Sequence, residues 1–91
     1  MKNQTKEELR GIFNQYDIGG IPIQKDTNWD EYNPEIEQLE LHLKRIKNVT
    51  DLENMLVMIF DKMFWKGISK KKDMNKIANE VFRVLKENNE I

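Results

Sequence analysis

Cysteine is absent from this 91-residue chain. The chain therefore has no disulfide bridge, no thiolate nucleophile and no cysteine-ligated zinc site. Secreted domains of this size usually depend on disulfides, so we expect the protein to reside in the reducing cytoplasm.

Long hydrophobic runs are missing as well. The longest has six residues, 55–60, whereas a helix needs ~20 apolar residues to span a bilayer. Residues 1–8 are polar and lack the apolar stretch of a signal peptide. We therefore expect no membrane span and no membrane partner.

The chain as a whole has no excess of either charge sign. Charged residues make up 34% of it, yet the net charge is only −1. Because such a balance creates no global field that attracts a polyanion, we expect no nucleic-acid partner. The length suits one domain, residues 1–91, with a single core.

Apolar residues recur at the spacing of amphipathic helices, and no segment alternates strictly as a half-buried strand does. Residues 5–8 (TKEE) and 50–53 (TDLE) have the threonine-to-glutamate spacing of a capping box, which starts a helix. Gly19-Gly20 and Pro22 stop the first helix. We predict an all-α fold, a small four-helix bundle with a long ordered loop between helices one and two. The helices are expected at about 6–17, 34–47, 51–66 and 73–88.

Three large apolar residues lie away from the predicted core faces. At 100° per residue, Leu41 points away from Leu43, while Met58 and Trp65 lie on a line opposite Leu52. One interpretation is that the third helix is buried on two sides and that Leu41 is a single exposed residue. The other is an interface patch, because tryptophan and methionine are enriched at contacts. A patch of this kind would allow a weak homodimer in place of a monomer.

The residue pattern predicts no catalytic, cofactor-binding or metal-binding site, so we expect no enzyme activity. His42 is the only histidine, and neither Gln38 nor Leu39 is the carboxylate that a helical metal site would place there. Gly19-Gly20 lacks the following lysine and hydroxyl residue of a phosphate loop. Lysines 70–72 either hold phosphate or form a solvated turn. They have no interleaved aromatic residues and lie unfavourably at the start of a helix.

Acidic residues are concentrated between positions 26 and 43, a stretch with six acids and no lysine or arginine. It is either a solvated face or a surface for a basic protein partner, since complementary charge speeds encounter. Trp29 and Tyr32 either pin the loop to the core or act as aromatic anchors of a contact. The candidate partner-binding residues are Asp26, Trp29, Asp30, Glu31, Tyr32, Glu35, Glu37 and Glu40.

Two short segments, residues 16–22 (YDIGGIP) and 30–36 (DEYNPEI), together resemble a family of small all-helical bacterial proteins. In that family an opening helix ends in an aromatic-Asp-Pro-hydrophobic-Gly turn, and an Asp-Glu-Tyr element leads into the second helix. The resemblance covers residues 9 to about 60. This chain departs from the pattern because no proline follows Asp17 and the turn has an extra glycine.

The family includes immunity proteins of polymorphic or contact-dependent toxin systems, along with members of unknown function. The resemblance implies a helical fold and an immunity role, and it brings no catalytic residues. We therefore expect an inhibitor that neutralises a cognate toxin, such as a nuclease whose basic cleft would accept the acidic stretch. The alternative is a non-catalytic structural or regulatory module that self-associates or docks on another cytoplasmic protein.

Overall fold

The computed structural model describes residues 1–16, 32–64 and 66–91. These ranges contain helices and connecting turns and no strand, so the predicted all-α four-helix bundle is confirmed. Most of the loop predicted between the first two helices lies outside the described residues. The elements are α1 (Asn3–Tyr16), α2 (Asn33–Leu41), the 3₁₀ helix η1 (Leu43–Arg45), α3 (Val49–Met63), the 3₁₀ helix η2 (Ile68–Lys71) and α4 (Met74–Glu87).

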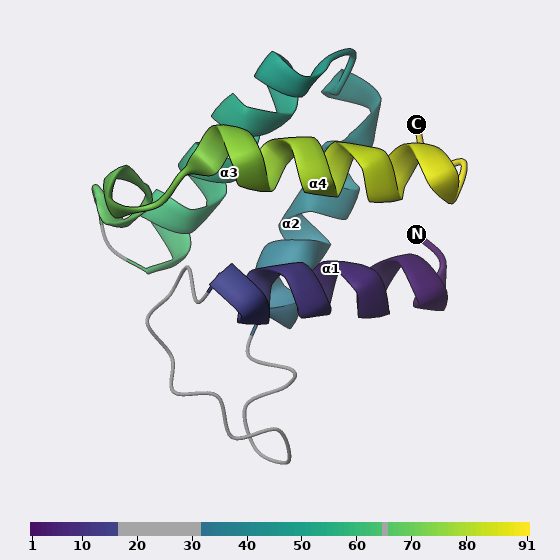
Figure 1. The fold of residues 1–91 in the computed structure, drawn as a ribbon, viewed down its shortest axis with the longest axis horizontal. Coiled ribbons are helices and arrows are strands. Elements are labelled where there is room, and N and C mark those ends of the chain that lie inside the picture. Colours follow the sequence, from purple (N-terminus) through teal and green to yellow (C-terminus); the bar gives the residue numbers. More distant parts are fainter. Residues whose placement is uncertain (17–31, 65) are drawn as a thin grey trace.

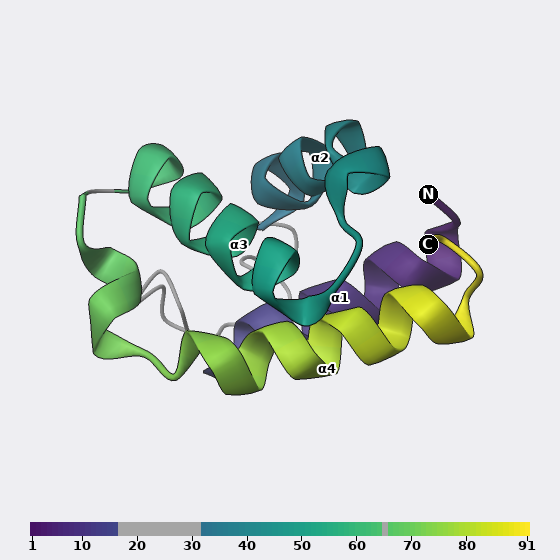
Figure 2. The same ribbon diagram turned by 90° about the horizontal axis from the view of Figure 1, so that it is seen from above.

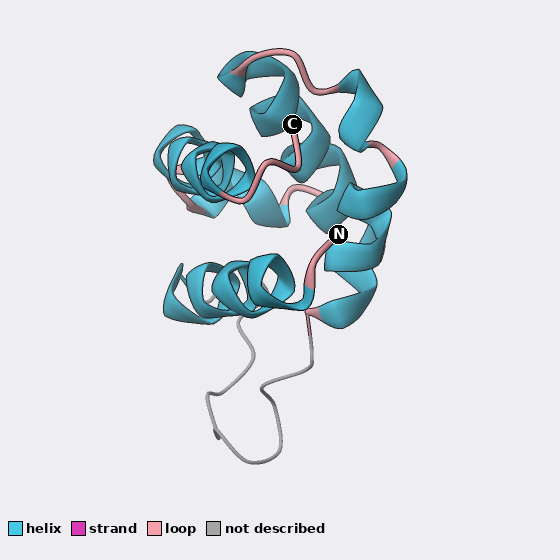
Figure 3. Ribbon diagram, turned by 90° about the vertical axis from the view of Figure 1, so that its right-hand side faces the viewer, coloured by secondary structure: helices cyan, strands magenta, loops and turns pink. Residues whose placement is uncertain are grey.

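Helices α1 and α4 run antiparallel, and the two chain ends lie close together (Figure 1). Helix α4 also packs against α3, and α2 contacts both α3 and α1, so the four helices enclose one core (Figure 2). Figure 3 views α1 and α4 almost end-on, with α2 on the other side of the core. Within the described ranges no helix is both long and apolar enough to cross a membrane.

The centre of the core is an aromatic cluster. The Phe13 and Phe60 rings meet edge to face with centroids 5.2 Å apart. Tyr32 contacts both rings, at 5.9 and 6.0 Å, and Phe64 stacks on Phe60 at 5.8 Å. Such pairs add to the free energy gained from burial. The cluster joins α1, the start of α2 and the end of α3, and so fixes how these three helices meet.

Both predicted capping boxes are wrong. Thr5 lies inside α1, fully buried, where its hydroxyl donates to Glu90 Oε2 at 2.7 Å. Helix α3 starts two residues earlier than predicted, with Asn48 as its cap: Asn48 Oδ1 accepts from the Asp51 amide at 2.8 Å. Asp51 Oδ2 accepts in turn from the Lys47 amide at 3.1 Å, so this pair satisfies two amides at the start of the helix.

The second helix is shorter than the predicted 34–47. Helix α2 ends at Leu41, and the chain continues as η1 with bonds between residues three apart, such as Arg45 amide to His42 carbonyl at 3.0 Å. This tighter turn still buries Ile46, because residues 43 and 46 share a face in a 3₁₀ helix as they do in an α-helix. Helix α3, predicted at 51–66, ends at Met63.

The fourth helix, predicted at 73–88, is confirmed to within one residue at each end, with Asp73 as its cap. The helical spacing predicts Phe82 on its inward face, but the structure buries Val84 and leaves Phe82 half-buried. The Lys86 Nζ lies 5.7 Å from the centre of the Phe82 ring. In α3 the same spacing predicts an inward Met63, together with Leu52, Leu56 and Ile59, and this is wrong for Met63, whose side chain is exposed.

Candidate functional site

The predicted partner-binding residues fall into three groups. Asp26, Trp29, Asp30 and Glu31 lie outside the described residues. Tyr32 and Glu35 are only 1% and 4% exposed, so their assignment to a partner surface is corrected: Tyr32 belongs to the aromatic core, and neither side chain is accessible to another protein. Glu37 and Glu40 remain at or near the surface.

Glu40 is engaged within the fold. Its carboxylate accepts a hydrogen bond from the amino group of Met1, and Lys6 Nζ lies 3.9 Å from its other oxygen. The bond from the Met1 ammonium holds the pKa of Glu40 below its usual value. The Glu40–Lys44 pair expected from helical spacing does not form, because the helix ends at Leu41. Among the acids of α2, Glu37 is therefore the one whose side chain is exposed and makes no hydrogen bond or ion pair with another described residue.

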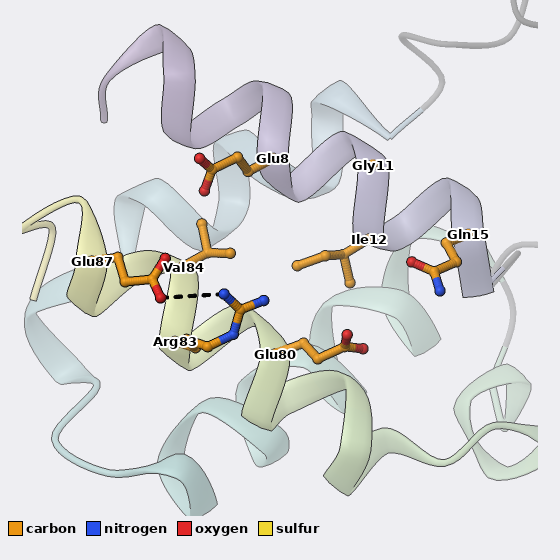
Figure 4. A pocket seen from close by; sticks show the side chains of 8 residues that line it. All are labelled: Glu8, Gly11, Ile12, Gln15, Glu80, Arg83, Val84 and Glu87. Atoms are coloured by element: carbon orange, nitrogen blue, oxygen red, sulfur yellow. Dashed lines mark hydrogen bonds and ion pairs between the residues drawn. The ribbon is translucent and has the colours of Figure 1, made fainter.

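An acidic groove of about 370 Å³ lies instead between α1 and α4 (Figure 4). Each helix contributes residues at the spacing of one helical face. The antiparallel arrangement brings Glu8 near Glu87 at one end and Gln15 near Glu80 at the other, with Ile12 between them. The lining residues are Glu8, Gly11, Ile12, Gln15, Glu80, Arg83, Val84 and Glu87.

The groove carries three glutamates and one arginine, so two negative charges are uncompensated within it. Arg83 Nη1 lies 3.2 Å from Glu87 Oε1, and both side chains are more than half exposed. Such an exposed pair holds its partners loosely. Glu8 is fixed more firmly, because its Oε2 accepts from Asn88 Nδ2 at 3.1 Å.

Tyr16 marks the far end of the groove. Its hydroxyl hydrogen-bonds the Glu80 carboxylate, which raises the pKa of Tyr16 above its usual value. The ammonium group of Lys76 lies 6.0 Å from the centre of the Tyr16 ring, within the range of a cation–π contact. The acidic groove thus gives way to positive charge at this point.

Gly11 lies in the wall of the groove and in the interior of α1. A Cβ atom placed there would have no atom within 4 Å, so the packing of the free protein does not require glycine. Glycine in a helix interior costs about 0.5–1 kcal/mol relative to alanine. Because Gly11 has no side chain, another molecule in the groove could approach the backbone of α1 closely at this point.

The exposed apolar residues form a weaker candidate. Leu41 is 73% and Met58 53% exposed, so the interpretation that α3 buries Met58 on a second face is wrong. Met58 borders a shallow hollow of about 260 Å³. Trp65 lies outside the described residues. The other residues of this hollow are Arg45, Asp51, Asn54 and Met55.

The sequence does not reveal the groove, because Glu8 on one wall is more than 70 positions away from Glu80 and Glu87 on the other. A run of acids such as 26–40 is visible in the sequence, whereas Glu8 and Glu87 come together only once α1 and α4 pair. The one indication of the groove in the sequence is that Glu80 and Glu87 are seven residues, or about two helical turns, apart and so lie on the same face of α4. Within the described ranges no group of three or more histidine or acidic side chains is arranged to hold a metal ion.

Comparison of the chain with protein-family models, curated proteins and solved structures finds no match.

Proposed function

We propose that this chain is a non-catalytic cytoplasmic inhibitor of the immunity type, which binds and neutralises a cognate bacterial toxin through an acidic surface. The observation that carries the proposal is the acidic groove between α1 and α4, with its two uncompensated negative charges. A basic partner segment would be attracted to such a surface and oriented by it. The cytoplasmic location rests on the absence of cysteine.

The groove also suits a protein partner in shape. It is an open channel between the antiparallel helices α1 and α4, and Gly11 lets a partner backbone or side chain approach α1 closely. The loosely held Arg83–Glu87 pair can rearrange when a partner cation arrives. Glu37 on α2 also belongs to the acidic stretch 26–43, and its exposed side chain could contact the same partner.

The test uses the protein encoded directly upstream of this chain, because an immunity gene is expected to follow its toxin gene. We expect the upstream protein to arrest growth when expressed alone and the chain to relieve the arrest. Association of the purified pair should weaken as salt concentration rises. An upstream product that is harmless, or that the chain does not bind, would refute the proposal.

A matched pair of variants locates the surface. Glu80→Gln with Glu87→Gln removes two negative charges from the groove, and Thr50→Lys with Asn54→Lys adds two positive charges at exposed positions on α3. Both double variants change the net charge equally. We expect the groove variant to slow association markedly at low salt and the α3 variant to have little effect. Equal slowing by both would mean that net charge, and not the groove, controls binding.

The second candidate function is a module that self-associates or docks through exposed apolar side chains. The observation that favours it is the exposure of Leu41 and Met58, since large exposed apolar residues often mark contacts. Sedimentation analysis separates the two functions. A dimer that Met58→Ser or Leu41→Ser dissociates would favour this module, and a monomer would favour the inhibitor.

A further inference from the structure

The end of the molecule at which α3 turns into α4 is basic. Five lysines with described side chains lie there: Lys62 in the last turn of α3, Lys66 and Lys70 in the turn and η2, and Lys72 and Lys76 at the start of α4. All are exposed except Lys72, which is half-buried. This basic end lies at the opposite end of α4 from the chain termini (Figure 1).

Asp61 and Asp73, the two acids of this region, offset only part of the charge of the five lysines, and their carboxylates bond to backbone amides and to Ser69. The Asp61 carboxylate accepts from the Ser69 amide at 3.2 Å and from its hydroxyl at 2.8 Å, and these bonds hold the pKa of Asp61 below its usual value. Asp73 Oδ1 accepts from the Lys76 amide at 3.1 Å as the cap of α4. No ion pair joins any of the five lysines to another residue in the described part of the chain.

The positions of two of these lysines, Lys72 and Lys76, oppose the stability of α4. Lys72 precedes the cap residue, and Lys76 lies in the first turn, where the helix dipole is positive and disfavours cations. The dipole of α4 therefore does not favour a cation at Lys72 or Lys76. A bound anion would compensate both the helix dipole and the mutual repulsion of the lysines.

The neighbouring apolar residue indicates which kind of anion fits. Met63 is 37% exposed at the end of α3, between Lys62 and Lys66 in the chain. The net charge of the chain is −1 although this end is positive, so the rest of the chain has an excess of acids, which would repel a long polyanion. A short acidic segment with an apolar side chain would meet the lysines and cover Met63.

We propose that the basic end is a second contact surface, which binds an acidic segment of a protein partner whose apolar side chain covers Met63. This surface adjoins the acidic groove, because Lys76 lies over Tyr16 and Tyr16 bonds Glu80. The proposal does not depend on the toxin-inhibitor function. If both hold, the paired surfaces of opposite charge would fix the orientation of the partner.

The experiment uses a fluorescein-labelled synthetic peptide with glutamates around a central leucine, titrated with the full chain and followed by anisotropy. We expect binding that weakens steeply with salt. Lys66→Glu with Lys70→Glu should lower the affinity at least about tenfold, because like charges then face each other. Lys44→Glu with Lys47→Glu makes the same change of net charge at exposed positions near the other end of α3, and should have little effect.

A second comparison tests the apolar contact. Met63→Ser should weaken binding of the leucine peptide and leave binding of a peptide with alanine in that place unchanged. Circular dichroism checks that each variant keeps its helices. Four outcomes would overturn the proposal: no peptide binding at low salt, equal weakening by both lysine pairs, tighter binding of a DNA duplex or of anionic vesicles than of the peptide, or self-association through these lysines.

Discussion

At the scale of single residues, substitution of two glycines by alanine is expected to change the stability of the fold in opposite directions, although both glycines have free space around them. Neither Gly11 nor Gly67 has an atom within 4 Å of an added Cβ. Gly11 lies in a helix, where alanine is favoured by about 0.5–1 kcal/mol. Gly67 has φ of +91°, in the left-handed region, where a side chain costs about 1–2 kcal/mol.

We therefore expect Gly11→Ala to raise the free energy of unfolding and Gly67→Ala to lower it, as measured by urea denaturation of both variants. If Gly11 is also the point of close approach in the groove, Gly11→Ala will weaken binding of the upstream protein although it stabilises the fold. A Gly11→Ala protein that is less stable than the parent would contradict the described surroundings of this residue.

Individual residues also show where a pattern in the sequence stops being informative. Leu9, Ile12 and Phe13 have the spacing of one helical face, which predicts that they are buried, and all three are, because burial there follows the helix period. The sequence leaves Tyr32 either in the core or at a contact, and the neighbouring acids favour a surface position for Glu35. Both are buried, since tertiary packing at the start of α2 decides their burial and the charge of their neighbours does not.

At the scale of elements, caps were the least predictable feature. Threonine followed by glutamate at 50–53 matches a capping box, yet the overlapping pair Asn48 and Asp51 performs this role. Asparagine and aspartate accept amide bonds as well as threonine and glutamate do, so the sequence offered two starting points two residues apart. The early end of α2 could not be read from periodicity either, because Leu43 and Ile46 suit both an α-helix and a 3₁₀ helix.

The start of α3 gives a prediction at this scale. Asn48→Ala removes the acceptor of the Asp51 amide and should lower the free energy of unfolding by about 1 kcal/mol. Thr50→Ala, two residues on and exposed within the helix, should change it by less than about 0.5 kcal/mol. Thermal melts of the two variants decide between the start found in the structure and the predicted start, and the opposite ranking would restore Thr50 as the cap.

At the scale of the whole molecule, hydrogen bonds join the two ends of the chain. Glu90 Oε2 accepts from the Lys2 amide at 2.8 Å and from the Thr5 hydroxyl at 2.7 Å. Lys2 Nζ donates to the Asn88 carbonyl at 2.7 Å. These contacts hold the start of α1 to the end of α4, and so keep the two walls of the acidic groove together at the end that contains Glu8 and Glu87. We call these bonds of Glu90 and Asn88 to Lys2 and Thr5 the terminal clamp. Loss of the clamp should both destabilise the fold and widen the groove.

The clamp makes stability depend on acid pH. The Lys2 amide bond, followed by the Thr5 hydroxyl bond, holds the pKa of Glu90 below the ordinary value of 4.5, and the Met1 ammonium does the same for Glu40. A carboxyl whose pKa is lower in the folded state binds fewer protons there than in the unfolded chain. Its stabilising effect is therefore complete above the unfolded value and is lost as pH falls through the folded value.

We expect the urea midpoint of the parent protein to be constant near neutral pH and to fall between about pH 5 and pH 3. Glu90→Gln keeps the shape of the side chain and removes its ionisation, so this variant should be less stable at neutral pH and show a shallower fall with acid. Glu37→Gln, at an exposed position on α2, is the matched control and should follow the parent curve. Parallel curves for Glu90→Gln and the parent would show that the bonds of Glu90 to Lys2 and Thr5 do not hold the chain ends together in solution.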